Sequence, residues 1–416
     1  MTERLYYADS FLYEFRAVIT EVVTGADGRS AVVLDRTAFY PESGGQPCDT
    51  GTLVIDGMPG LRVVAVAETE NGSEILHYLE EPPGPAVCRD APVTGSVDLA
   101  RRSQHRQEHS GQHILSGAFL KLFQMATLSF HMGEAGCTID LDARSLSEDQ
   151  LRQAEELANR VVWEDRPVEV RWATPEEAQA LGARKIPSGI PGPLRLIDIR
   201  DFDVNACGGT HVSRTGQVGA VLVRRCEKVK PGMRVEFVCG ARAVRAAGRD
   251  YALLTEAASL YSTHVSELPG QIRKSLEEIK TGQKERKQLL DDLAELYALK
   301  LVGQALPVGK CQVITWVFGD RDAAFVKLVA QKIAAYPPVS GQSTVALLGC
   351  VSNSQAALVF AQTTGGPYDM TMLMHGAMEV LGGRGGGNKD LAHGGAPAGS
   401  DLDRVIAESA EFLAYG

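Results

Sequence analysis

Residues 101–123 read RRSQHRQEHSGQHILSGAFLKLF, and here the character of the sequence changes. Leu115, Phe119 and Leu122 recur at three- and four-residue steps, which predicts one face of a helix. Before this stretch, residues 1–96 form short runs of alternating apolar and polar residues, such as SAVVLDR and LRVVAVAET, separated by Gly, Pro and Asn-Gly. That alternation is typical of strands. The contrast predicts a small N-terminal β-barrel, followed by a domain that opens on a helix.

The domain that follows is predicted to be α/β and to cover residues 97–245. Ser147 and Gln150 form a capping box, which starts a second helix over 148–164. Alternating or continuous apolar runs predict the strands CTIDLD, 167–172, 194–199, 217–227 and 233–240.

A helical stalk is predicted over residues 246–308, and a second α/β domain over residues 309–416. In the stalk, apolar residues recur at three- and four-residue steps, Gln283 and Arg286 interrupt the seam, and Pro269 starts or kinks the run. This pattern suits a coiled coil that pairs with a second chain, and it equally suits a helix packed on its own domain. The apolar positions are Ile272, Leu276, Ile279, Leu290, Leu293 and Tyr297.

Composition excludes several classes of protein. The 416 residues are 44% hydrophobic, contain no apolar run of membrane-spanning length, and begin without the basic start of a secretory signal. We therefore expect a cytoplasmic protein that does not enter a membrane. The 8 cysteines include no CxxC pair and are too sparse for a disulfide scaffold.

The net charge of −10 argues against uniform phosphate binding, but it leaves room for local basic strips. Each of two arginine- and lysine-rich clusters can be interpreted as solvated surface or as phosphate contacts. Their position beside the candidate metal ligands favours phosphate contacts, above all for Arg102 and Arg106. The clusters are Arg101, Arg102 and Arg106, and Arg224, Arg225, Lys228, Lys230 and Arg234.

Two short motifs together predict a zinc site. His109 and His113 stand four residues apart, which places them on one face of a helix. Cys207 and His211 flank a Gly-Gly pair, which allows the backbone to fold sharply. Three imidazoles and one thiolate make a complete tetrahedral set for Zn²⁺. His105, one turn earlier on the helix, is a rival ligand or a partner of one.

Other familiar sites are missing from the sequence. HExxH is absent, so metalloprotease chemistry lacks its general base, and the HxE with PCxxC signature of nucleobase deaminases is absent too. Neither a GxxxxGK[ST] loop nor a strand–GxGxxG–helix unit is present to hold nucleotide phosphates.

Four segments resemble the editing region of alanyl-tRNA synthetase and, still more, the stand-alone long AlaX-type alanyl-tRNA editing proteins. They are TAFYPESGGQPCDTG (37–51), HSGQHILSGAF (109–119), SFHMG (129–133) and CGGTHVSRTGQVG (207–219). The glycine-rich tail GGRGGGNKDLAHGGA (382–396) is similar to the end of the DHH-associated domain that closes alanyl-tRNA synthetase. In this tail an RNA contact and a surface loop are equal interpretations.

The resemblance implies an α+β multidomain protein with an N-terminal β-barrel, a zinc-containing α/β editing domain, a helical stalk and a C-terminal α/β domain. It implies a trans-acting hydrolase for mischarged tRNA(Ala), chiefly Ser-tRNA(Ala) and also Gly-tRNA(Ala), and a homodimer through the stalk and C-terminal domain. Because nothing resembles the class II catalytic core, aminoacylation is not expected. The alternatives are a zinc-stabilised tRNA-binding or dimerisation module without hydrolysis, and editing of another aminoacyl-tRNA.

The same resemblance assigns roles within the site. Thr37 matches the residue that distinguishes serine from alanine, and Gln46 belongs to the glycine-rich motif that faces the site. His131 is expected to contact the terminal ribose or the amino acid, or else to be a capped loop histidine. Gly44 and Gly45 are expected to make a turn that approaches the substrate closely.

Overall fold

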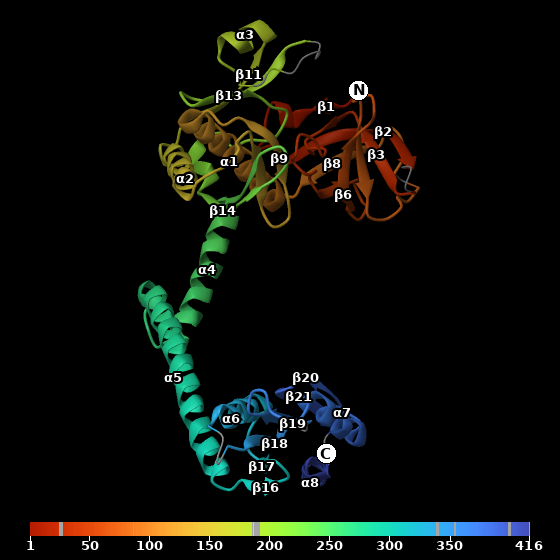
Figure 1. Cartoon of the computed structure of the whole chain (residues 1–416). Helices are drawn as coiled ribbons and strands as arrows, with labels where there is room; N and C mark the ends of the chain where they lie inside the picture. The colour runs from red at the N-terminus through yellow and green to blue at the C-terminus, as the bar shows by residue number, and fades with distance from the viewer. Residues whose placement is uncertain are drawn as a thin grey trace. The chain divides into compact units, whose positions relative to one another are not determined.

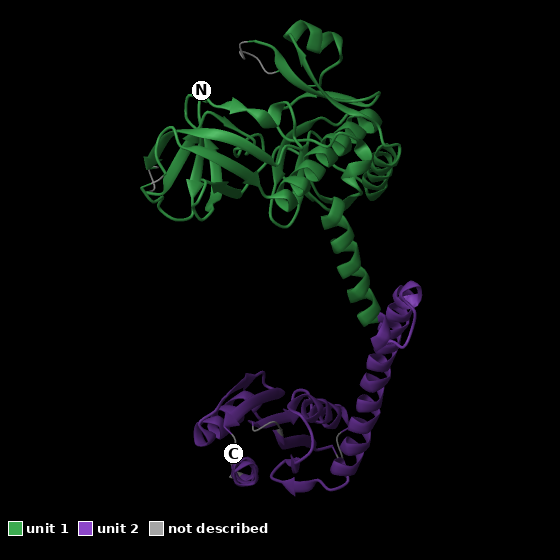
Figure 2. Cartoon of the chain, turned by 180° about the vertical axis from the view of Figure 1, so that it is seen from behind, with its two compact units in different colours: residues 1–257 green, residues 258–416 purple. Residues whose placement is uncertain are grey.

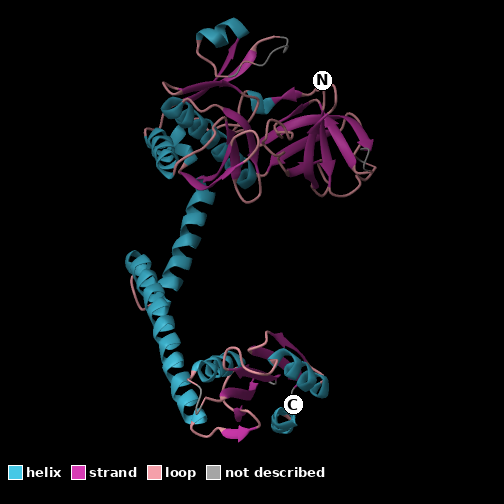
Figure 3. Cartoon of the chain, in the orientation of Figure 1, coloured by secondary structure: helices cyan, strands magenta, loops and turns pink. Residues whose placement is uncertain are grey.

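The computed structural model describes residues 1–416 except 25–27, 86, 185, 187–191, 338–340, 353–354, 398–400 and 416. The chain divides into two compact units, Met1–Ala257 and Ala258–Gly416 (Figure 2). Each unit combines helices and sheets (Figure 3), so the prediction of an α+β multidomain protein is confirmed. The finer division into four domains stays a prediction.

The first unit begins with a closed six-stranded barrel, as the alternating pattern predicts (Figure 1). Its strands follow the order β2-β3-β7-β6-β5-β8, and inward residues such as Ile19, Val32 and Ile75 are fully buried. A short strand β1 (Glu3–Arg4) pairs with β4 (Arg36–Thr37), and the helical turn η1 (Leu5–Tyr7) follows β1. The barrel strands are β2 (Glu14–Thr24), β3 (Ser30–Leu34), β5 (Gly51–Val54), β6 (Leu61–Glu68), β7 (Ile75–Leu79) and β8 (Pro92–Val97).

Helices α1 (Leu99–Phe123) and α2 (Glu148–Trp163) pack on a four-stranded sheet of order β14-β15-β10-β9. The predicted capping box at Ser147 is present at the start of α2. Apolar residues of α1, including Ile114 and Phe119, are fully buried in this core. The strands are β9 (Thr127–Met132), β10 (Cys137–Leu141), β14 (Val221–Lys228) and β15 (Met233–Cys239), with the turn η2 (Thr215–Val218) before β14.

A second, three-stranded sheet of order β11-β12-β13 completes the first unit, with the short helix α3 (Pro175–Ala180) beside it (Figure 1). Strand β11 (Val168–Ala173) lies at the edge, β12 (Leu194–Ile199) in the middle, and β13 (Asp203–Ala206) leads directly into CGGTH. The boundary between the units falls within α4 (Gly240–Leu260).

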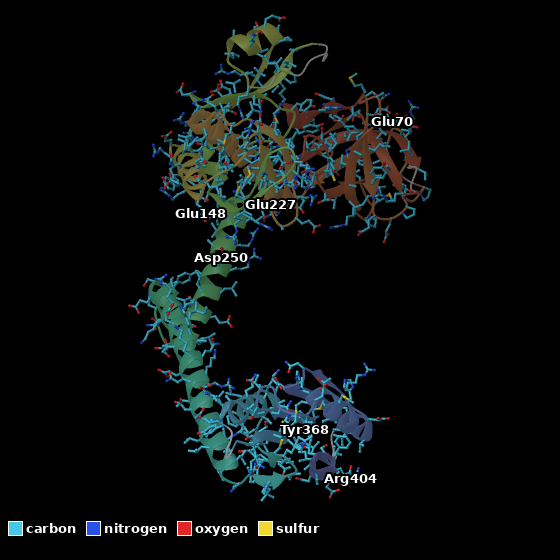
Figure 4. All side chains as sticks on the ribbon, viewed as in Figure 1. Glu70, Glu148, Glu227, Asp250, Tyr368 and Arg404 are labelled. Carbon is cyan, nitrogen blue, oxygen red and sulfur yellow. The ribbon has the colours of Figure 1, made fainter. Side chains whose placement is uncertain are left out.

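The second unit is built on a six-stranded sheet of order β16-β17-β18-β19-β21-β20. Its apolar residues gather in two buried clusters, one containing α6 and the other containing α7 and α8. Tyr368, labelled in Figure 4, donates a hydrogen bond to Leu413 O at 2.7 Å and so ties α8 to the segment before α7. The elements are η3 (Val265–Glu267), α5 (Leu268–Val302), β16 (Leu306–Val308), β17 (Cys311–Phe318), α6 (Ala323–Ala335), β18 (Ser343–Ser352), β19 (Gln355–Gln362), α7 (Met370–Leu381), β20 (Arg384–Gly387), β21 (Leu391–Pro397) and α8 (Leu402–Tyr415).

The structure of helix α5 decides two points that the stalk prediction left open: the role of Pro269 and the packing of the apolar seam. Pro269 lies in its first turn and therefore starts the helix without kinking it. Leu290, Leu293 and Tyr297 pack against the α6 cluster of the same unit, as the single-domain interpretation expects. The earlier seam positions, including Leu276, are exposed. A coiled coil with a second chain stays a prediction.

The glycine-rich tail is ordered as a hairpin of β20 and β21, so the surface-loop interpretation is wrong for its described residues. Within the described part of the chain, none of the helices combines the length and apolarity needed to cross a bilayer.

Candidate metal centre

The four predicted zinc ligands converge in the first unit. The ligand atoms of His109, His113, Cys207 and His211 all lie within 4.8 Å of one another, although the two motifs are far apart in the sequence. Both His109 Nε2 and His211 Nε2 lie 3.3 Å from Cys207 Sγ. The three imidazoles are buried, and the cysteine is partly buried. The centre thus brings together α1 and the turn that follows β13.

Polar groups behind the imidazoles fix which nitrogen faces the centre. Gln46 Oε1 accepts a hydrogen bond from the backbone N–H of Thr210 at 3.1 Å and lies 2.8 Å from His109 Nδ1. A carbonyl oxygen only accepts, so Nδ1 of His109 carries the proton and Nε2 keeps its lone pair for a metal. Nδ1 of His211 similarly lies 3.1 Å from Ser110 Oγ.

The electrostatics of the centre also suit a cation. Burial, with the charge of Arg195, lowers the pKa of His109 to about 3, and it places those of His113 and His211 well below their usual range. All three are therefore neutral, as ligands must be. Burial raises the pKa of the Cys207 thiol, so a thiolate there needs a compensating positive charge. The donor set, its burial and its oriented nitrogens fit Zn²⁺.

Neither Gly208 nor Gly209 of CGGTH has a positive φ, so the backbone conformation does not require glycine at either position. What a glycine provides here is space for neighbouring side chains. A Cβ built on Gly209 would lie 2.1 Å from Cε1 of His109, whereas one on Gly208 would lie 3.5 Å from the Tyr7 hydroxyl. The expected sharp fold is therefore not what requires glycine. At Gly209 the constraint is the close approach of the His109 imidazole.

Gly44 and Gly45 form the predicted turn, with φ of +59° and +81°. A Cβ on Gly45 would lie 2.5 Å from Phe130 O, so the close approach is to strand β9 of the protein itself. The Phe130 ring is 5.4 Å from the His109 ring, which places this turn beside the centre. His131, the next residue on β9, is exposed on a strand and is not in a loop.

Gln46 and Thr37 are both fully buried with their polar groups already partnered. The amide of Gln46 contacts His109 and Thr210 on both sides, since its Nε2 also donates to Thr210 Oγ1 at 3.0 Å. The Thr37 hydroxyl lies 2.8 Å from His77 Nε2 inside the barrel and accepts a hydrogen bond from the Phe39 backbone. Their predicted roles toward a substrate stay predictions.

Arg102 does not lie where the phosphate interpretation needs it, whereas for Arg106 that interpretation stays a prediction, because its Nε and Nη1 have no hydrogen-bond partner among the described residues. Arg102 is fully buried, and its guanidinium forms an ion pair with Asp49 and donates to Ser10 O. Arg106 is also buried, with its guanidinium carbon 3.7 Å from the centre of the Phe11 ring. Arg102 thus joins α1 to Ser10 and Asp49, and Arg106 joins it to Phe11 and Tyr13 of the N-terminal segment.

Much of the second basic cluster is neutralised by acids. Arg224 pairs with Asp250, which Figure 4 labels, and Arg234 pairs with Asp140 at 2.7 Å. Arg225 pairs with Glu227 at 3.0 Å. These pairs favour the surface-charge interpretation for the three arginines.

Sequence reasoning missed Ser110, Asp203 and Arg195. Ser110 lies inside the HSGQH motif, but its contact with His211 spans 101 positions. Asp203 Oδ2 is 3.9 Å from Nδ1 of His113. Arg195 donates to Cys207 O at 2.6 Å and to Gly209 O at 3.0 Å, which holds the CGG turn. The spacing of residues within a motif does not indicate such contacts, because each one joins residues from different segments of the chain.

Two family models match this chain. The model described as "Threonyl and Alanyl tRNA synthetase second additional domain" matches residues 194–235, which include Cys207 and His211. The model described as "tRNA synthetases class II (A)" matches residues 5–99, which contain the barrel.

Curated alanine–tRNA ligases are similar to the chain over nearly its whole length. The ligase of Pyrococcus furiosus is 33% identical over 407 residues, which cover 94% of this chain and 42% of that protein. The ligase of Methanothrix thermoacetophila is 32% identical over 420 residues, covering 97% of this chain and 44% of that protein. The chain thus spans less than half the length of these curated relatives.

Among solved structures, the C-Ala domain from Aquifex aeolicus alanyl-tRNA synthetase aligns with 27% of this chain and 98% of that domain at 18% identity. Its TM-score of 0.24 is too low for the likeness to bear on the fold.

Proposed function

Because the chain is an alanyl-tRNA-synthetase-derived protein of the editing type, we propose that it hydrolyses the ester of mischarged tRNA(Ala), chiefly Ser-tRNA(Ala) and also Gly-tRNA(Ala). The observation that carries the proposal is the convergence of His109, His113, Cys207 and His211 within 4.8 Å. In this proposal Zn²⁺ is the resident metal, and the protein acts in the cytoplasm without aminoacylating tRNA.

A bound Zn²⁺ supplies positive charge that orders the pocket and polarises oxygen atoms close to it. The chain's own residues orient the ligands: Gln46 holds His109, and Ser110 holds His211. Arg195 fixes the carbonyls of the CGG turn, so that the thiol of Cys207 faces the imidazoles.

Selectivity against alanine follows from hydrogen bonding. A pocket that pairs with the serine hydroxyl leaves a buried polar group unpaired when alanine enters, and that costs more binding than the difference in size. Thr37 is the proposed partner of this hydroxyl, and His131 on the exposed edge strand is the proposed contact for the terminal ribose. The Thr37 hydroxyl would have to exchange its contact with His77 for the substrate.

The experiment is a deacylation assay with purified full-length protein on Ser-, Gly- and Ala-tRNA(Ala), with and without a chelator. We expect release of serine and glycine, sparing of alanine, and loss of activity in Cys207→Ala but not in Cys88→Ser, whose cysteine is exposed. If the metal-loaded protein leaves every mischarged tRNA intact, the hydrolase proposal fails.

A second candidate function is a zinc-stabilised tRNA-binding module without hydrolysis. It is favoured by the four candidate protein ligands, which leave Zn²⁺ no open position, and by the Gln46 amide, whose oxygen and nitrogen both already have partners within the protein. In the same assay this candidate predicts metal-dependent folding and tRNA affinity with no release of amino acid.

A further inference from the structure

An exposed tryptophan stands at the edge of the sheet that carries the CGGTH turn. Trp172 is 54% exposed on β11, the edge strand of the β11-β12-β13 sheet. Its register partner on β12 is Arg195. Because directly opposed residues of an antiparallel pair project from the same face, Trp172 and Arg195 lie side by side on that face. An aromatic surface thus adjoins the residue that holds the metal-binding turn.

Arg195 carries an unused hydrogen-bond donor. The residue is 7% exposed, and its guanidinium donates to the backbone carbonyls of Tyr7, Cys207 and Gly209 at 3.2, 2.6 and 3.0 Å. Its Nη2 has no hydrogen-bond partner among the described residues. An unpaired donor on a buried cation is costly unless a ligand completes it. The chemistry of this donor favours an anionic or strongly accepting partner.

Tyr7 connects Trp172 to the metal-binding turn. Its ring centre is 6.2 Å from that of Trp172 and 5.4 Å from the Arg195 guanidinium carbon. The Tyr7 hydroxyl faces Gly208, where an added Cβ would lie 3.5 Å away. Trp172, Tyr7 and Arg195 are here called the aromatic platform. Trp172 contacts Tyr7, Tyr7 contacts Arg195, and Arg195 donates to the carbonyl of Cys207.

The neighbouring charges indicate what kind of partner this surface suits. The guanidinium carbons of Arg4 and Arg195 both lie close to the Tyr7 ring, at 5.5 and 5.4 Å. Trp172 is therefore the exposed aromatic of this group. Arg195 lies beside it, Arg171 and Glu177 line the same depression, and Arg4 is paired with Glu68 at 2.7 Å. An exposed aromatic beside arginines is the arrangement by which proteins bind unpaired nucleotides, with bases on the ring and phosphates on the guanidinium.

We propose that the aromatic platform binds the unpaired 3′-terminal nucleotides of the RNA substrate, with a base stacked on Trp172 and a phosphate or ribose oxygen accepting from Arg195 Nη2. The proposal rests on the proposed function for its ligand, and it deepens that function by naming the surface that leads the acylated end to the metal.

The test uses full-length protein and two uncharged RNA hairpins, one with a single-stranded 3′ tail and one blunt. Binding is followed by tryptophan fluorescence and by titration of labelled RNA. Wild type is expected to prefer the tailed hairpin. Trp172→Ala is expected to lose about tenfold in affinity for the tailed hairpin only, while Trp172→Phe retains most of it. Trp163→Ala is the matched control, because Trp163 is 75% exposed on α2.

Equal tail preference in wild type and Trp172→Ala overturns the proposal, as does a loss that extends to the blunt hairpin. A change in self-association with unchanged RNA binding assigns Trp172 to a protein contact and overturns it too. This assay needs no hydrolysis, so it separates the two proposals. A protein that binds tails through Trp172 without deacylating refutes only the hydrolase, and a deacylase whose KM is unchanged in Trp172→Ala refutes only the platform.

Discussion

The side-chain oxygen of Gln46, from the loop before the barrel strand β5, lies 2.8 Å from Nδ1 of His109 on α1. Because this contact fixes the tautomer of a proposed zinc ligand, Gln46→Leu is expected to weaken zinc binding by about 10–100-fold without changing the ligand set. Zinc competition with a coloured chelator measures the effect. Gln153→Leu, on the surface of α2, is the control, and equal zinc affinity in the two variants contradicts the assigned contact.

The glycine pair of CGGTH offers a matched comparison. Gly209→Ala places a Cβ 2.1 Å from the His109 ring and is expected to lose stoichiometric zinc, because the imidazole must move. Gly208→Ala meets the Tyr7 hydroxyl at 3.5 Å, an ordinary contact, and is expected to keep it. Metal content after gel filtration distinguishes the two. Full zinc in Gly209→Ala would show that the approach to His109 is not restrictive.

The buried pair of Arg102 and Asp49 is expected to act on stability and not on RNA binding. Asp49→Asn leaves a fully buried guanidinium without its countercharge and is expected to destabilise the first unit by about 3–5 kcal/mol. Urea unfolding followed by near-UV circular dichroism measures it. Asp149→Asn, which breaks an exposed pair with Arg152, is expected to leave the midpoint unchanged. A wild-type midpoint for Asp49→Asn together with weaker RNA binding would restore the phosphate interpretation.

His77 is expected to make the barrel sensitive to acid. Burial lowers its pKa from 6.5 to about 4, and its two ring nitrogens face Thr37 Oγ1 and Val32 O. Between these two values the unfolded chain binds a proton that the folded chain does not, so stability falls as the pH drops from 6.5 toward 4. The full loss is about 3 kcal/mol.

Urea midpoints at several pH values in this interval test the expectation. His77→Gln is expected to show a shallower dependence on pH than wild type. Identical slopes for wild type and His77→Gln would exclude His77 as the titrating group.

Sequence patterns predicted those features that depend only on residues close together in the chain. The four-residue step between His109 and His113 is a property of the helix itself, and the capping box at Ser147 involves only its own turn. The alternation in residues 1–96 was enough to predict the barrel, because each strand must present one face to the core.

Features that depend on contacts distant in sequence could not be predicted. Arg102 resembles a surface charge until Asp49, 53 positions away, is placed against it. Trp172 and Arg195 are neighbours only through strand register. The two strands of the tail could not be predicted, because glycine has no side chain and so the tail shows no alternation of apolar and polar residues.

The 98 positions between His109 and Cys207 also bear on how the chain is made. During synthesis the strands of the barrel and all of α1 leave the ribosome before the CGGTH turn, so His109 and His113 are present before Cys207 and His211. A metal held by all four side chains would therefore be bound only after both motifs have been made and have folded together.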